Sequence, residues 1–237
     1  LELKSFRKID TSSLDTEPKW NFIGLEDARL IFWDNIYYVC GVRRDTNPTG
    51  IGRMELCEID IVSDKNKVIE KSRNRIEVKD INSYCEKNWM PIKDKPFHFI
   101  KWTNPTEIVK INLQEKFADQ VMLSDKYEPL EFDLRGGSQL VKWKDKYISI
   151  VHECKFIPKN INNYKDAYYY HRFVVWNEDF SINKISDTFT FMTGKIEFCI
   201  GLEIIDNDVY IAYSFQDNLS YIVKCKTSLL DTILEML

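Results

Sequence analysis

The sequence lacks the features by which several large classes of protein are recognised. No apolar run in its 237 residues approaches the roughly 18 residues of a membrane-spanning helix, and no secretory signal peptide opens the chain. Lys and Arg number 33 against 37 Asp and Glu, so no excess of positive charge favours nucleic acid or anionic lipid. These absences predict a protein with neither a nucleic-acid partner nor a membrane partner.

Cysteine and histidine are sparse and widely spaced. The six cysteines form no close pair, which argues against both a zinc site and a disulfide scaffold. Most of them lie in or beside apolar stretches, where reduced structural thiols are expected, and this favours a reducing, cytoplasmic location. The three histidines stand in different segments, so the sequence predicts no metal site, no metal cofactor and no Ser-His-Asp arrangement.

Aromatic residues, by contrast, make up 14% of the chain and gather in short β-branched runs. Three segments share one pattern, an apolar run, a polar turn with Asp or Asn, and a second apolar run: residues 30–40, 140–151 and 202–213. Residues 97–111 form a looser fourth copy. The pattern is typical of β-hairpins, because the runs are too short and too β-branched for helices.

The spacing of these hairpins predicts the fold. They recur at intervals of roughly 45 to 70 residues, as the blades of a β-propeller do. An irregular β-sandwich would also produce many short strands and is the alternative. Four hairpins with unmatched ends predict an all-β, five-bladed β-propeller that occupies residues 1–237 as a single domain. The tail differs, because apolar residues at helical spacing predict a short C-terminal helix: Leu229, Leu230, Ile233, Leu234 and Leu237.

Polar residues stand at the same end of every predicted hairpin, before the first strand or after the second. Because these two places lie at one end of an antiparallel pair, the residues are expected to meet at one mouth of the propeller. They are Glu26, Asp27, Arg29, Lys87, Asn88, Arg135, His152, Glu153, Glu197 and Asp217. Carboxylates across such a mouth suit glycoside chemistry, and Arg, Lys and His suit a phosphate anion. Each residue alone is more simply a solvated charge at a strand end, so the repetition carries the prediction.

Aromatic and basic residues beside these positions are weaker candidates. Trp89 is either a platform for a sugar ring or a packed core residue. His171 and Arg172 follow a tyrosine run and are either ligand contacts or part of a strand between blades. For Tyr169, within that run, packing in a core strand is the favoured interpretation.

Four motifs in order, GLEDARL, EKNWMPI, RGGSQLVKW with YISIVHE, and IEFCIGLEI with VYIAYSFQD, carry a family resemblance. From about Gly24 to Asp217 the chain resembles the five-bladed propellers of the β-mannoside phosphorylases and mannosidases, glycoside hydrolase family 130. The resemblance implies an inverting reaction on a β-mannoside or a related glycan. It implies no cofactor, with inorganic phosphate as co-substrate in a phosphorylase, and association with a glycosyltransferase domain or partner.

The resemblance also implies roles for individual residues. Asp27 matches the general acid, which in the family sometimes acts through a sugar hydroxyl, and Ala28 replaces the usual Pro beside it. Glu153 or Glu197 would activate water in a mannosidase. Substrate-binding roles are implied for Glu26, Arg29, Lys87, Asn88, Trp89 and Asp217, and phosphate-binding roles for Arg135, His152 and Lys87. Glu153 stands where the family has Gly, and a carboxylate there is expected to repel phosphate.

The start of the chain leaves a second function open. The relatives carry an inner hairpin before their first motif, which residues 1–23 are too short to supply, so an N-terminal truncation is expected. A propeller without that hairpin, and with Ala28 in its acid motif, is compatible with a non-catalytic glycan-binding or scaffolding module associated with a glycosyltransferase. The sequence leaves both functions open.

Overall fold

The four predicted hairpins are present in the computed structural model of the protein, which describes residues 2, 5–62, 67–79, 82–157 and 166–236. Their turns use backbone of positive φ, at Asp34 (50°) and Asn35 (64°) in the first hairpin and at Asp206 (54°) in the last. Short polar side chains accept this left-handed conformation most easily. The local sequence therefore dictates where these strands reverse direction.

The strands form four sheets, described here from the N-terminus. The first contains β1 (Ile9–Asp10), β2 (Leu25–Trp33), β3 (Ile36–Arg43), β4 (Arg53–Val62) and β5 (Lys67–Arg75). The second contains β6 (Met90–Pro91), β7 (His98–Trp102), β8 (Thr106–Asn112) and β9 (Phe117–Ser124). The third contains β10 (Leu134–Arg135), β11 (Val141–Trp143), β12 (Lys146–Ile157), β13 (Asp166–Trp176) and β14 (Ile182–Ile185). The fourth contains β15 (Glu197–Ile205), β16 (Asp208–Phe215) and β17 (Leu219–Lys226).

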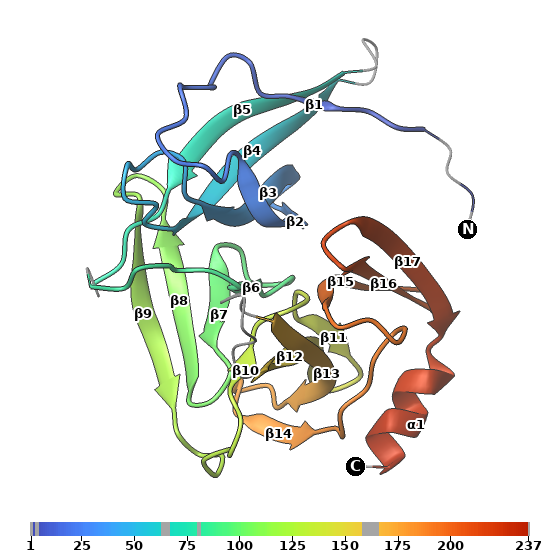
Figure 1. The fold of residues 1–237 in the computed structure, drawn as a ribbon. Coiled ribbons are helices and arrows are strands. Elements are labelled where there is room, and N and C mark those ends of the chain that lie inside the picture. The colour runs from blue at the N-terminus through green and yellow to red at the C-terminus, as the bar shows by residue number, and fades with distance from the viewer. Residues whose placement is uncertain (1, 3–4, 63–66, 80–81, 158–165, 237) are drawn as a thin grey trace.

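These sheets surround a common centre, with β2, β6 and β15 toward the middle and β1, β9, β14 and β17 at the outer edges of their sheets (Figure 1). This is the arrangement of a β-propeller, so the prediction of an all-β propeller is confirmed and the sandwich alternative is wrong. Four sheets are formed by the described residues, whereas the sequence predicts five, and the count of five stays a prediction.

The predicted C-terminal helix is confirmed as α1 (Ser228–Met236). Leu230, with 1% of its surface exposed, anchors it in the core between the third and fourth sheets. The carboxylate of Asp231 accepts hydrogen bonds from Trp143 Nε1 at 3.3 Å and Lys144 Nζ at 2.7 Å, which ties the helix to the β11–β12 turn. Leu237 and the side chain of Leu234 lie outside the described residues. No helix of the described chain is both long and apolar enough to cross a membrane.

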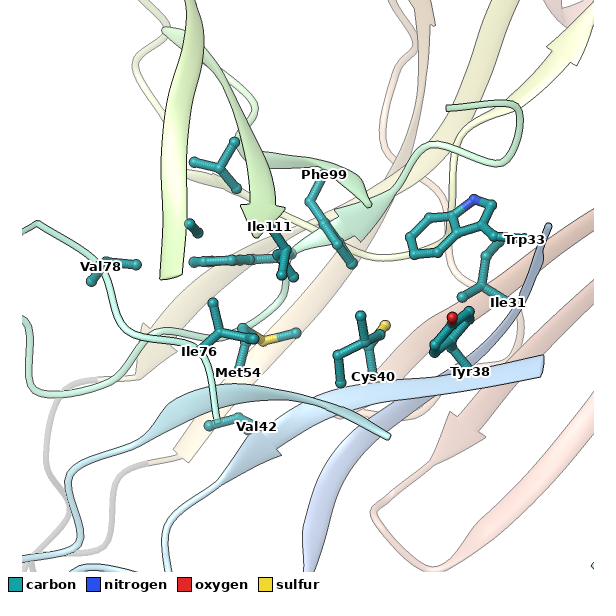
Figure 2. Close-up of a cluster of buried hydrophobic side chains, with 14 residues drawn as sticks. Ile31, Trp33, Tyr38, Cys40, Val42, Met54, Ile76, Val78, Phe99 and Ile111 are labelled. Carbon is teal, nitrogen blue, oxygen red and sulfur yellow. The ribbon is translucent and has the colours of Figure 1, made fainter. Parts of the chain in front are cut away.

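Three apolar clusters fill the spaces between successive sheets. Figure 2 shows the first of them, where side chains of β2, β3 and β4 meet those of the second sheet. Trp33 is 2% exposed and packs edge-on against Phe99 with ring centroids 5.4 Å apart. Full burial of one large apolar side chain stabilises a fold by roughly 1.5 to 3 kcal/mol. These clusters hold the sheets in fixed relative positions, so the inner strand ends form a defined site.

Candidate functional site

A cavity of about 310 Å³ opens where the inner ends of all four sheets meet. The first sheet contributes Glu26 and Asp27, and the segment before β6 contributes Lys87 and Asn88. The third sheet contributes Arg135, His152 and Tyr169, and the fourth contributes Phe198 and Asp217. The structure thus brings together seven residues that the sequence places at one mouth, Glu26, Asp27, Lys87, Asn88, Arg135, His152 and Asp217, whereas their chemical roles stay predictions.

Asp27 faces the cavity because the strand that carries it is irregular. The β2–β3 pairing shifts register between Glu26 and Arg29, and Asp27 itself has a φ of 54°. A β-bulge of this kind bends a strand and changes the direction of its side chains. As a result, the adjacent Glu26 and Asp27 both line the cavity instead of alternating between the two faces of the sheet.

Arg29 is not among the residues that line the cavity, so the geometry gives no support to its predicted contact with substrate. Its side chain is 1% exposed and donates from Nε to the carbonyl of Gly137 at 2.7 Å and from Nη1 to the carbonyl of Asp27 at 2.8 Å. Its guanidinium also stacks on the ring of Phe198, 5.5 Å from the centroid. Arg29 therefore positions the backbone of Asp27 and links three sheets of the propeller.

The segment before β6 reaches the cavity because Gly136 leaves room for it. A Cβ atom at Gly136 would lie 1.8 Å from the carbonyl oxygen of Asn88, far inside any allowed contact. Asn88 has a φ of 63°, a conformation that Asn tolerates better than most residues. The Gly-Gly pair that the sequence offers as a family motif thus has a steric role beside the site.

His152 is buried and held between aromatic rings. Its ring stacks on Tyr169 with centroids 5.0 Å apart and meets Phe198 edge-on, also at 5.0 Å. Burial, reinforced by nearby His171 and cationic groups, lowers the pKa of His152 well below its ordinary value. The imidazole is therefore neutral near pH 7, and it can donate one hydrogen bond without adding a charge.

Several buried polar atoms of the cavity wall have no hydrogen-bond partner among the described residues. Among the described residues, Glu26 Oε1, Asn88 Oδ1 and His152 Nδ1 are buried and make no hydrogen bond. Buried polar atoms are almost always satisfied, so three unsatisfied ones around one cavity indicate a place for a polar ligand. Burial also raises the pKa of Glu26, which favours its protonated form relative to an exposed glutamate.

Glu153 does not line the cavity, so the geometry gives no support to its predicted role in activating water. His152 and Glu153 are neighbours in β12, and side chains alternate between the faces of a strand. Glu153 is 3% exposed and binds Arg172, with Oε2 3.1 Å from Nε and 3.0 Å from Nη2. Its charge is therefore paired with Arg172 on the other face of the strand.

Glu197 makes structural contacts, and the geometry gives no support to its predicted catalytic role. Its side chain is fully buried and accepts hydrogen bonds from the backbone N–H groups of Phe191 (2.7 Å), Met192 (3.0 Å) and Gly194 (3.1 Å). Three such bonds satisfy a carboxylate and fix the loop before β15. Glu197 lies outside the group of residues that lines the cavity, so it has no access to substrate there.

Trp89 packs in the core, which favours the packing alternative, although the residue also borders a neighbouring cavity together with Lys87 and Asn88. It is 1% exposed, belongs to the cluster between the first and second sheets, and donates from Nε1 to Glu86 Oε2 at 3.2 Å. His171 is fully buried too and accepts a hydrogen bond from the backbone N–H of Cys199 at 3.3 Å. For both residues the packing alternative is the one observed.

Two lining residues were not predicted from the sequence. Tyr169 was assigned to a core strand, and Phe198 was not singled out beside Glu197. In the structure Cys154 pairs with Tyr169 and His152 with His171, so Tyr169 shares a face with His152. The shared face follows from the pairing of residues between β12 and β13, and the sequence alone does not determine that pairing. Burial raises the pKa of the Tyr169 phenol, which keeps it protonated and able to donate.

Comparison with solved structures shows which fold this chain shares. It superposes on the β-1,2-mannobiose phosphorylase of Listeria innocua with a TM-score of 0.59 and 14% identity, covering 90% of this chain and 61% of that one. A glycosyl hydrolase of Bacteroides ovatus superposes with a TM-score of 0.53 and 8% identity, covering 86% and 65%. No family model and no curated protein matches the sequence. The predicted resemblance to these propellers is confirmed at the level of the fold.

The chain spans about 61% of the length of the Listeria phosphorylase. The shared part includes 90% of the present chain. The comparison therefore shows the fold, and a fold by itself does not determine the chemistry of a site.

Proposed function

We propose that this protein is a glycoside phosphorylase that cleaves a β-mannoside or a related glycan by an inverting mechanism. The observation that carries the proposal is the composition of the central cavity, in which three carboxylates face two cations and a neutral histidine. The carboxylates are Glu26, Asp27 and Asp217, and the cations are Lys87 and Arg135. Glycosidic cleavage needs a proton donor, and phosphorolysis needs a site for an anion.

In the proposed reaction, these groups act on phosphate and on the glycosidic bond. A phosphate oxygen attacks the anomeric carbon from the face opposite the leaving group, and the bond from that carbon to the glycosidic oxygen breaks. Asp27, as the carboxylic acid, gives its proton to the departing oxygen. The products are a sugar 1-phosphate of inverted configuration and the shortened glycan. Lys87, Arg135 and the N–H of His152 bind phosphate, while Asp217 and Glu26 bind sugar hydroxyls.

We propose phosphorolysis instead of hydrolysis because the two glutamates that could activate water lie outside the cavity. Both glutamates that could have activated water, Glu153 and Glu197, are committed to Arg172 and to backbone N–H groups. Two cations remain in the cavity and can neutralise an anionic nucleophile, to which neutral His152 can donate a hydrogen bond. The shared fold with a β-1,2-mannobiose phosphorylase supports the same choice of substrate class.

The test is incubation with β-linked mannobioses, with and without inorganic phosphate. Mannose 1-phosphate formed only when phosphate is present is the expected result. Free mannose in both mixtures would identify a hydrolase instead. Binding of mannobiose without turnover would favour the non-catalytic glycan-binding module. The number of five blades, a cytoplasmic location and a glycosyltransferase partner are separate predictions from the sequence, and this experiment does not test them.

A further inference from the structure

A buried positive charge lies where the first, third and fourth sheets meet behind the cavity. The guanidinium of Arg29 donates to the carbonyl oxygens of Asp27 and Gly137 and lies against the ring of Phe198. Only 1% of the residue is exposed, and an arginine stays protonated in proteins even where burial lowers its pKa. A full charge is therefore held away from water, which costs free energy unless an opposite charge compensates it.

No carboxylate of the described chain compensates Arg29 by direct contact. Other buried arginines of the first sheet have such a partner, since Arg43 Nε lies 2.6 Å from Asp45 and Arg53 Nε lies 3.2 Å from Glu77. Arg29, by contrast, bonds only to backbone carbonyls among the described residues, and its buried Nη2 atom has no hydrogen-bond partner there. Its charge is thus left without a counter-ion in the folded chain.

The charge of Arg29 acts on the cavity wall through packed rings. Its guanidinium lies 5.5 Å from the centroid of Phe198, whose ring meets His152 edge-on at 5.0 Å, and both rings line the cavity. Burial lowers the pKa of His152, and the charges of His171, Arg135 and Arg29 act in the same direction. Packed side chains screen a charge far less than water does, so an anion in the cavity is attracted by Arg29 without touching it.

The groups that line the cavity do not by themselves provide an excess of positive charge. In the proposed reaction Asp27 is protonated, which leaves two carboxylates opposite two cations, Lys87 and Arg135. Arg135 is also shared with Asp133, whose Oδ2 lies 3.4 Å from its Nε. Protonation of Asp27 further removes the carboxylate charge that favours the buried guanidinium of Arg29. A phosphate anion in the cavity and the cation behind it therefore each lack a partner that the other supplies.

We propose that Arg29 supplies the counter-charge that makes the cavity select an anionic nucleophile, acting across Phe198 without contact. This inference rests on the proposed function and adds to it the residue that sets the preference for phosphate over water. Arg29 is not a catalytic residue in this role. Its effect falls on the affinity for phosphate, and the affinity for an uncharged sugar is expected to depend on it little.

The experiment measures the dissociation constants of inorganic phosphate and of β-1,2-mannobiose by calorimetry, in the native chain and in two variants. Arg29→Gln keeps a hydrogen-bond donor for a carbonyl oxygen and removes the charge, whereas Arg29→Lys keeps both a donor and the charge. We expect phosphate affinity to fall about tenfold or more in Arg29→Gln and less than about threefold in Arg29→Lys. Mannobiose affinity should change less than about threefold in either variant.

Arg53→Gln is the matched control. Arg53 is 5% exposed and also donates to two backbone carbonyls, those of Gly52 at 2.9 Å and Ser83 at 2.8 Å. It differs from Arg29 in having a carboxylate partner and in lying away from the rings that line the cavity. We expect Arg53→Gln to unfold at a lower urea concentration than the native chain and to bind phosphate with native affinity.

The comparison of charged and neutral variants separates an electrostatic role from a structural one. Equal loss of phosphate affinity in Arg29→Gln and Arg29→Lys, or no loss in Arg29→Gln, overturns the role of Arg29 and leaves the proposed function intact. So does an equal loss of affinity for mannobiose. Arg29→Met, which is neutral and unbranched, replaces Arg29→Gln if that variant does not fold. A native chain that binds mannobiose but not phosphate overturns the phosphorylase proposal and this inference together.

Discussion

Arg29 Nη1 donates a hydrogen bond of 2.8 Å to the carbonyl oxygen of Asp27, two residues earlier in the same strand. The same guanidinium reaches Gly137 of the third sheet through Nε at 2.7 Å. A buried, planar and rigid donor thus supports the irregular backbone that turns Asp27 into the cavity. The geometry of the proposed acid depends on contacts between sheets, and it is tested by changing the acid itself.

Replacement of Asp27 by Asn removes the proton of the proposed acid and keeps its shape. We expect turnover of mannobiose to fall by roughly two to four orders of magnitude, as loss of general acid catalysis does. The fold should survive, because Asn accepts the positive φ that Asp27 has. Asp206→Asn is the control, since Asp206 has the same φ of 54° in the β15–β16 turn, outside the cavity. Activity of Asp27→Asn equal to the native rate would remove Asp27 from the mechanism.

Replacement of Glu197 by Gln is expected to change stability and not the chemical step. The carboxylate accepts three backbone hydrogen bonds, and an amide cannot replace all of them. We expect the free energy of unfolding to fall by about 1 to 3 kcal/mol, measured by urea denaturation. The kcat of the folded fraction should stay close to native. A large loss of kcat at unchanged stability would return Glu197 to a catalytic role.

The ion pair between Glu153 and Arg172 is expected to stabilise the fold, and replacement of Arg172 tests this. Arg172→Met leaves the buried carboxylate without its main partner, although Lys155 Nζ lies 3.2 Å from Glu153 Oε1. We expect a loss of about 3 to 5 kcal/mol, the usual effect of breaking a buried ion pair. The double variant Arg172→Met with Glu153→Gln should recover part of it. Strictly additive losses in this cycle would mean that the two side chains do not interact.

Because His171 is buried in a neutral state, we expect the free energy of unfolding to fall in mild acid. Burial lowers its pKa from 6.5 to about 4, so the folded protein holds this histidine neutral. Above pH 6.5 neither state is protonated and the full stability is present. As the pH falls from about 6.5 toward 4, the unfolded chain takes up a proton that the folded chain does not. The free energy of unfolding therefore falls with decreasing pH, by about 3 kcal/mol over this window.

The measurement is chemical denaturation at several pH values between 7 and 4.5. His171→Gln keeps an acceptor for the backbone N–H of Cys199 and removes the titrating group. We expect a shallower dependence of stability on pH in this variant than in the native chain. The lowered pKa of His152 acts in the same direction and accounts for part of the slope that persists. Identical slopes in the two proteins would contradict the assignment to His171.

Gly136→Ala tests the steric role of the glycine pair. The added Cβ would meet the carbonyl oxygen of Asn88 at 1.8 Å, so one of the two segments must move. We expect destabilisation of about 1 to 3 kcal/mol and weaker binding of sugar, because Lys87 and Asn88 line the central cavity. Thermal unfolding and mannobiose titration give the two readouts. Native stability together with native affinity would show that the two segments have room to spare.

The hairpins and the gathering of polar residues at one end of them were accessible from the sequence. Turn residues such as Asp34 and Asn35 act over a few positions, and antiparallel strands return to the same end whatever surrounds them. The direction of single side chains was less accessible. Side chains alternate between the two faces of a strand, so of the neighbours His152 and Glu153 only His152 lines the cavity.

By itself, the sequence determined the strands, their turns and the chemical kinds of group that meet in the cavity, because each depends on neighbours along the chain. Only the tertiary structure decided which groups reach the ligand. The bulge at Asp27, the β12–β13 register that puts Tyr169 against His152, and the burial of Trp89 between two sheets all depend on strand pairing and packing in the folded chain. Such packing joins residues far apart in the chain, and no local pattern records it.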